Sequence, residues 1–214
     1  PRAIEGLSYA GFDVLSVANN HMFDYSREAL EDTFFRLKEA GISYVGGGFT
    51  AKEAYLPIIK EVKGIKIAFL AFTNLGTPYW EAKTESSGIA WLTEENLKEG
   101  IKEAKAKADL IVVSFHFGPE YQTKTSPEQR YWARLAVDSG ANLVIGHHPH
   151  VVQEVEQYQG AWIAYSLGNF VFDQSFSKET MEGMLLEAVI KNKKIEKVAS
   201  RKVIISSDFQ PYLK

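Results

Sequence analysis

Residues 142–150 read NLVIGHHPH, and this stretch decides the fold prediction. Its first part, residues 142–145, is typical of a buried strand, and it leads through a glycine into a cluster of three histidines. In an α/β protein, the residues just past the carboxyl ends of strands line the crevice where ligands bind. The stretch therefore predicts a strand that delivers His147, His148 and His150 to a binding crevice.

Two other strand-like runs end in the same way. Residues 13–17 lead into Asn20 and His21, and residues 110–115 lead into His116. All five histidines of the chain thus follow predicted strands. We expect three separate segments to deliver imidazoles and an amide to one pocket.

Imidazole is a common ligand of zinc, iron and nickel, so the pattern predicts a metal site. The pair His148 and His150 could aim two rings at one metal or at two neighbouring metals. His116 would be a rigidly placed ligand, and Asn20 offers a neutral oxygen. His21 could bind metal or donate a proton. A lone histidine is more often structural, and it is the combination of clusters that favours a metal.

Other polar positions lie near these clusters. Asp24 and Glu120 could orient a ligand histidine, whereas the alternatives are a helix N-cap for Asp24 and a solvated loop charge for Glu120. The glycine-containing turn at residues 166–170 could direct Asn169 into the site. The glycine run at residues 46–48 is better explained as a plain tight turn than as a phosphate-binding loop.

Composition limits the class of protein. The 214 residues fit one domain, residues 1–214, and the net charge of −3 gives no electrostatic footprint for nucleic acid. The absence of cysteine excludes disulfides and thiolate ligands. No apolar run is long enough for a transmembrane helix, and no signal peptide is visible. Because the first residues resemble the middle of a domain, we expect natural sequence, with any signal or anchor, to precede Pro1.

The remaining pattern predicts strand and helix in alternation, followed by a final third that is mostly strand. This order favours a mixed α/β fold. Residues 74–88 are polar and irregular, and they are the candidate surface or substrate loop. Helices are expected over residues 4–10 and 26–40, after Thr93, and from Ser126 to Gly140. Strands are expected over residues 12–17, 42–45, 56–62, 65–72, 110–115, 151–155, 161–166, 183–190 and 194–205.

The motifs together resemble the CapA family of poly-gamma-glutamate capsule biosynthesis proteins. They occur in the family's order, from near the start to about Asp173. They read ANNH with DY at residues 18–25, HFGPEY at 116–121, GHHPHV at 146–151 and SLGNF at 166–170. The set is specific, although each motif alone is not.

The resemblance implies a calcineurin-like metallophosphoesterase fold. That fold has two facing mixed β-sheets flanked by helices, in four αββα layers, with a two-metal centre at the strand ends. By resemblance, Asn20, His116, His148 and His150 are metal ligands, with His147 as an alternative to His148. His21 would contact substrate phosphate or protonate the leaving group, and Asp24, Glu120, His147 and Asn169 would orient ligands or contact substrate.

The chain departs from this pattern at its start. The superfamily's first strand and its aspartate ligands are not found before residue 18, so the N-terminal strands are expected to be missing. We therefore expect an incomplete site for divalent ions such as manganese, zinc or iron. An unpaired sheet edge favours pairing with a second copy or with a missing N-terminal segment.

Two functions follow from the resemblance. The first is a metal-dependent hydrolase of phosphoesters within capsule polymer biosynthesis. The alternative is a non-catalytic protein that binds or helps export an anionic polymer. The full-length protein would act at the cell surface or outside the cytoplasm, with membrane association only through sequence outside this chain.

Overall fold

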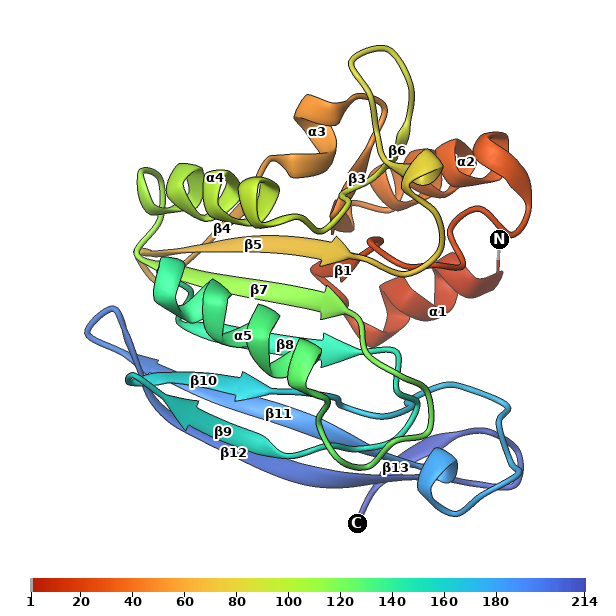
Figure 1. Cartoon of the computed structure of the whole chain (residues 1–214). Helices are drawn as coiled ribbons and strands as arrows, with labels where there is room; N and C mark the ends of the chain where they lie inside the picture. Colours follow the sequence, from red (N-terminus) through yellow and green to blue (C-terminus); the bar gives the residue numbers. More distant parts are fainter. Residues whose placement is uncertain (1) are drawn as a thin grey trace. The chain divides into compact units, whose positions relative to one another are not determined.

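The computed structural model describes residues 2–214, and this part of the chain divides into two compact units (Figure 1). The first unit ends at Ala108 and the second comprises Asp109–Lys214. Strands and helices alternate from α1 to β8, and the remainder of the chain is mostly strand, so the α/β class expected from the sequence is confirmed. No helix within residues 2–214 combines the length and the apolar character that a membrane crossing needs. The expectation of a single domain stays a prediction.

The first unit holds three small groups of paired strands. Strand β1 pairs in parallel with β2, whereas β3 pairs with β6 and β4 with β5 in antiparallel fashion. The irregular segment expected over residues 74–88 contains one short 3₁₀ turn, and β6 begins at its end. In chain order the elements are α1 Arg2–Ala10, β1 Val14–Ser16, α2 Ser26–Glu39, β2 Ser43–Val45, β3 Gly47–Gly48, α3 Ala51–Tyr55, β4 Ile58–Val62, β5 Ile65–Thr73, η1 Pro78–Trp80, β6 Gly88–Ile89 and α4 Glu94–Lys105.

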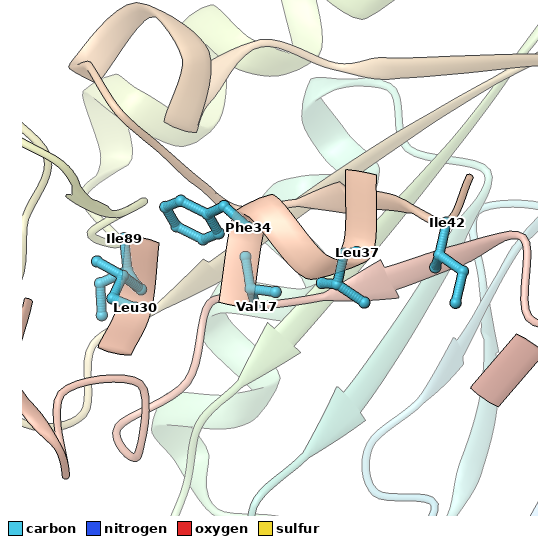
Figure 2. Packing of buried hydrophobic residues seen from close by; sticks show 6 residues of the cluster. All are labelled: Val17, Leu30, Phe34, Leu37, Ile42 and Ile89. Atoms are coloured by element: carbon cyan, nitrogen blue, oxygen red, sulfur yellow. The ribbon is translucent and has the colours of Figure 1, made fainter. Parts of the chain in front are cut away.

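Helix α2 supplies three of the six buried side chains of one hydrophobic core (Figure 2). Leu30, Phe34 and Leu37 follow the spacing of one helix face, and all three are buried. Burial of side chains of this size contributes about 1.5–3 kcal/mol each. The same cluster takes in Val17, which follows β1 and precedes the Asn20–His21 segment. The core thus fixes the start of that segment.

The glycines at residues 46–48 do more than form a plain tight turn, which corrects that expectation. Gly47 and Gly48 make strand β3. A Cβ added at Gly47 would lie 2.8 Å from Val17 Cγ2 and 2.9 Å from Phe34 Cζ. Only glycine lets the backbone pass this close to the core.

The second unit contains two sheets and one long helix. Strands β7, β8 and β10 are parallel neighbours, and β9 is antiparallel to β10. Strands β11, β12 and β13 form a separate antiparallel sheet. Isolated bridges, Val152 with Leu167 and Gly168 with Gly183, connect the intervening loops. The elements are β7 Leu110–His116, α5 Pro127–Ser139, β8 Leu143–His147, β9 Val155–Tyr158, β10 Ala161–Ala164, η2 Glu179–Met181, β11 Glu182–Lys191, β12 Lys194–Ile205 and β13 Pro211–Leu213.

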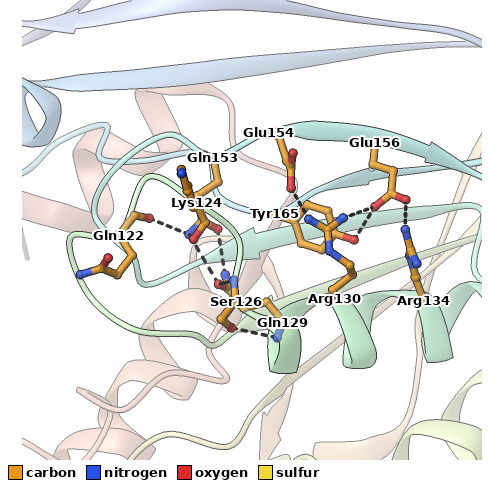
Figure 3. A network of polar contacts seen from close by, with 10 residues as sticks. All are labelled: Gln122, Lys124, Ser126, Gln129, Arg130, Arg134, Gln153, Glu154, Glu156 and Tyr165. Carbon is orange, nitrogen blue, oxygen red and sulfur yellow. Dashed lines mark hydrogen bonds and ion pairs between the residues drawn. The ribbon is translucent and has the colours of Figure 1, made fainter.

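Helix α5 begins with the capping box that the sequence predicts. The Ser126 hydroxyl accepts from the Gln129 backbone N–H, and the Gln129 side chain accepts from the Ser126 N–H. The buried Gln129 amide also donates to Gln153 Oε1 at 2.8 Å, and Gln153 donates to the Gln122 carbonyl at 2.7 Å (Figure 3). These bonds hold the loop between β7 and α5 against the chain that follows the histidine cluster.

The strand expected over residues 151–155 is wrong in its position, because β9 spans Val155–Tyr158. Val152 makes only an isolated bridge, and the Gln153 side chain is buried in its contacts with Gln129 and the β7–α5 loop. The hydrogen bonds of the buried Gln153 amide thus leave this segment outside the strand pairing. Ion pairs from Arg130 and Arg134 to Glu156 support β9 itself.

Candidate metal site

Two adjacent parallel strands carry the histidines of the second unit. Strand β7 ends at His116 and β8 ends at His147, and these two residues are partners in the sheet register. The Phe117 N–H donates to the His147 carbonyl at 3.1 Å, so the pairing continues just past β7. The loops that follow both strands therefore leave the same edge of the sheet, where parallel α/β sheets place their ligands.

The loop after β8 has an unusual backbone. His148 has φ +95° and His150 has φ +60°, and side chains are disfavoured in this left-handed region. Such conformations cost about 1–3 kcal/mol each and cluster at functional sites. The Tyr121 N–H donates to the Pro149 carbonyl at 2.8 Å, which ties the loop after β7 to this one. The strain turns both imidazoles inward, where their side chains are only 8% and 12% exposed.

The tie between the loops places a carboxylate before both rings. Glu120 Oε1 lies 4.0 Å from His148 Nε2 and 3.9 Å from His150 Nε2. Both distances are too long for hydrogen bonds. Among residues 2–214, this is the one group of acidic, histidine or cysteine side chains whose ligand atoms all lie within 4.8 Å of one another. Two imidazoles and one carboxylate are a donor set that suits zinc and related divalent ions, so these residues fit a metal.

Asn169 holds the His150 ring from its other side. His150 Nδ1 lies 2.9 Å from Asn169 Oδ1. The Asn169 amide donates to the Thr180 carbonyl at 2.9 Å and to Gln174 Oε1 at 3.2 Å, which leaves its oxygen for the ring. His150 therefore carries its proton on Nδ1 and directs the Nε2 lone pair toward Glu120. The role expected for Asn169, to orient or contact, stays a prediction.

His116 and His147 lie beside this group but outside it. The His116 ring makes an edge contact with the His148 ring, with the centroids 4.9 Å apart. Burial lowers the pKa of the His147 imidazole to about 4, so this side chain is neutral at neutral pH. Of the two alternatives for the H-x-H register, it is His148 that faces Glu120 together with His150. The ligand role of His116 stays a prediction.

The residues expected from the first unit form their own hydrogen-bonded group. His21 Nδ1 lies 2.9 Å from Asp24 Oδ2, and Asn20 Nδ2 lies 3.4 Å from His21 Nε2. Asp24 does not cap α2, because Tyr25 occupies the N-cap position and makes no side-chain cap bond. The His21 and Asp24 side chains are 59% and 49% exposed. That these residues share a pocket with His116 stays a prediction.

The sequence did not indicate the aromatic and amide side chains that surround the His150 ring. Tyr121 stacks on His150 at 5.8 Å between centroids, and Phe172 approaches the same ring at 5.1 Å. Gln174 donates to the Tyr121 hydroxyl at 3.2 Å. Partial burial, then the charge of Glu120 and a hydrogen bond to it, raise the pKa of the Tyr121 hydroxyl. Tyr121 follows Glu120 in the sequence, but no spacing signal pointed to Phe172 or Gln174.

The fold has solved relatives. A 5'-nucleotidase precursor from Thermus thermophilus matches 98% of this chain and 42% of its own, with a TM-score of 0.62 and 15% identity. A calcineurin-like phosphoesterase from Bacillus subtilis matches 98% of this chain and 63% of its own, with a TM-score of 0.54 and 17% identity. The chain therefore has the metallophosphoesterase fold that the sequence motifs imply, and that expectation is confirmed.

Sequence comparison identifies the family. The profile of the bacterial capsule synthesis protein PGA_cap matches residues 1–174, and the chain belongs to this family. It is 40% identical over 179 residues to the capsule biosynthesis protein CapA of Bacillus anthracis, covering 82% of this chain and 44% of that protein. It is 37% identical over 190 residues to the PGA biosynthesis protein CapA of Bacillus subtilis, covering 88% of this chain and 50% of that protein. The chain thus spans about half the length of these curated relatives.

Proposed function

We propose that this capsule-synthesis family member binds a divalent metal ion and uses it to hydrolyse phosphoesters. The observation that carries the proposal is the convergence of Glu120, His148 and His150 on one small volume at the carboxyl end of a parallel sheet. Backbone strain at both histidines supports it, because strained loops of this kind persist where a site needs them.

The chain's own residues divide the work. His148 and His150 would hold the ion, with Asn169 fixing the His150 ring. A bound divalent ion supplies Lewis acidity and lowers the pKa of a coordinated water. His21 Nδ1 lies 2.9 Å from Asp24 Oδ2, which orients the ring, and His21 is the residue that we propose to protonate a leaving group.

The hydrolase proposal is tested on the chain with Mn²⁺ and bis(p-nitrophenyl) phosphate. We expect Mn²⁺-dependent release of p-nitrophenol that is lost in His148→Ala and retained in Glu61→Gln. Glu61 is an exposed residue of strand β4 and is remote in sequence from every candidate site residue, which makes it a matched control for surface charge. Equal rates in His148→Ala and the unmodified chain would refute the proposal.

The names of the relatives favour a second candidate function. A Mycobacterium tuberculosis relative, 28% identical over 172 residues, is described as a probable polyglutamine synthesis accessory protein. An accessory role would use the pocket to bind an anionic polymer, such as poly-gamma-glutamate, without turnover. Binding of poly-gamma-glutamate in a calorimeter, without any Mn²⁺-dependent phosphodiesterase activity, would favour this alternative.

A further inference from the structure

We propose that Glu120 is itself a ligand of the metal, so that Glu120, His148 and His150 make a three-ligand site complete within the second unit. This inference rests on the proposed metal site. It differs from the sequence-based expectation, in which Glu120 orients a ligand or contacts substrate. The geometry around the carboxylate decides between these three roles.

The position of Glu120 does not fit an orienting role. A residue that orients a metal-bound histidine hydrogen-bonds the ring nitrogen that faces away from the metal. In His150 that nitrogen is Nδ1, and Asn169 already occupies it at 2.9 Å. Glu120 instead faces Nε2 of His150 and Nε2 of His148 at nearly equal distances, beyond hydrogen-bonding range of either.

A substrate-binding role fits no better. The substrates proposed for this site, phosphoesters or a polyglutamate, are anionic. A carboxylate that faced such a substrate directly would repel it. The same negative charge is favourable when a cation lies between the carboxylate and the two rings.

The distances fit a shared ion. Ligand atoms about 2.1 Å from a tetrahedral ion lie about 3.4 Å apart. Glu120 would have to approach each imidazole by about 0.5 Å, and the ligand atoms of the two imidazoles, which lie within 4.8 Å of each other, would have to close by at most about 1.4 Å. The Glu120 side chain is 43% exposed and has room to make this movement. Two neutral nitrogens and one carboxylate oxygen, with no thiolate, suit Mn²⁺, Fe²⁺ or Zn²⁺.

One chain of contacts positions both the Glu120 carboxylate and the His150 imidazole. Asn169 fixes the His150 ring and also donates to Gln174. Gln174 donates to the Tyr121 hydroxyl, and that hydroxyl contacts Glu120. The carboxylate and the imidazole are therefore positioned by the same amide, Gln174, which makes it a positioning residue for the site.

The test is Mn²⁺ binding followed by electron paramagnetic resonance, in which the signal of free Mn²⁺ is counted during a titration. Glu120→Gln removes the charge but keeps an oxygen of the same reach. We expect it to raise the dissociation constant by more than about 100-fold, beyond the loss of about 10–100-fold that removal of an orienting partner alone produces. Glu61→Gln serves as the control, and the urea midpoint of the metal-free variants checks that both fold.

Three results separate the possibilities. A loss of more than about 100-fold in Glu120→Gln, together with weakened binding in His148→Ala, supports the inference. Normal binding in Glu120→Gln, or a loss of up to about 100-fold, with loss in His148→Ala overturns the ligand role of Glu120 and leaves the metal site intact. Equal binding by all variants overturns the proposed metal site itself.

A second readout is independent of the metal. Long-range ¹H–¹⁵N spectra of the metal-free protein, labelled on histidine and assigned with His150→Gln, report the tautomer of each ring. We expect the proton of His150 on Nδ1, as its contact with Asn169 requires. A proton on Nε2 would contradict the hydrogen bond from Nδ1 to Asn169, and with it the assignment of Nδ1 as the nitrogen that faces away from the metal.

Discussion

The substitution Gly146→Ala tests whether the histidine loop depends on close backbone packing. A Cβ at Gly146 would lie 1.9 Å from the Tyr165 carbonyl oxygen and 2.8 Å from Phe117 Cε1. Ordinary contact begins at 3.4 Å, so the backbone would have to move by about 1.5 Å. The Gly146 carbonyl also accepts from the Leu167 N–H at 3.1 Å, so such a movement would disturb a bond between β8 and the segment that follows β10.

We expect Gly146→Ala to lower the free energy of unfolding by about 3 kcal/mol, the upper part of the range for overpacked cores. For a chain of this size, that corresponds to a fall in Tm of about 6–12 °C. The measurement is urea unfolding followed by circular dichroism, with the midpoint falling and the slope unchanged.

Gly6→Ala is the control. Gly6 lies in α1 with no atom within 4 Å of its added Cβ. There alanine should be neutral or stabilising by up to about 1 kcal/mol, because it is the better helix former. If the two glycine variants unfold at the same urea concentration, the packing argument for the histidine loop is refuted.

Two further predictions concern the polar contacts of the second unit. Burial opposes the charge on Glu156, but hydrogen bonds from the Tyr165 hydroxyl and Arg134 outweigh this effect and lower the pKa of Glu156. Because the pKa is lower in the folded state, the ionised Glu156 stabilises the fold at pH values above its unfolded-state pKa. That stabilisation is lost as the pH falls through the folded-state pKa. Glu156→Gln should therefore flatten the dependence of the urea midpoint on pH between about pH 7 and pH 3, and an unchanged dependence would contradict this. Gln129→Leu should lower the free energy of unfolding by about 1–3 kcal/mol, because it leaves the buried Gln153 amide oxygen without its hydrogen bond. The double variant with Gln153→Leu should lose less than the sum of the two single variants. Additive losses would show that the two amides are uncoupled.

Local patterns predicted much of the fold. The buried face of α2 follows from the spacing of Leu30, Phe34 and Leu37, and the start of α5 follows from the Ser126–Gln129 capping pair. Both signals lie within one or two helical turns of sequence. The ends of β7 and β8 were also predictable, because continuous apolar runs stop where the histidines begin.

The rest depends on contacts between distant segments. Glu120 reaches the histidines because the Tyr121 N–H bonds to the Pro149 carbonyl and because His148 adopts a positive φ. No sequence pattern marks the main-chain bond, and only glycine signals a positive φ in a sequence. The place of β9 depends likewise on a buried amide pair, Gln129 with Gln153, which lie 24 positions apart.

The bond from the Tyr121 N–H to the Pro149 carbonyl joins main chain to main chain. Its strength does not depend on which side chains the two loops carry. Residue 120 is therefore open to exchange: aspartate, histidine or glutamine could stand there while the loops keep their paths. The two loops keep a fixed main-chain geometry while the side chain at position 120 can change. A substitution there, by evolution or by design, could therefore alter the preferred metal without altering the fold.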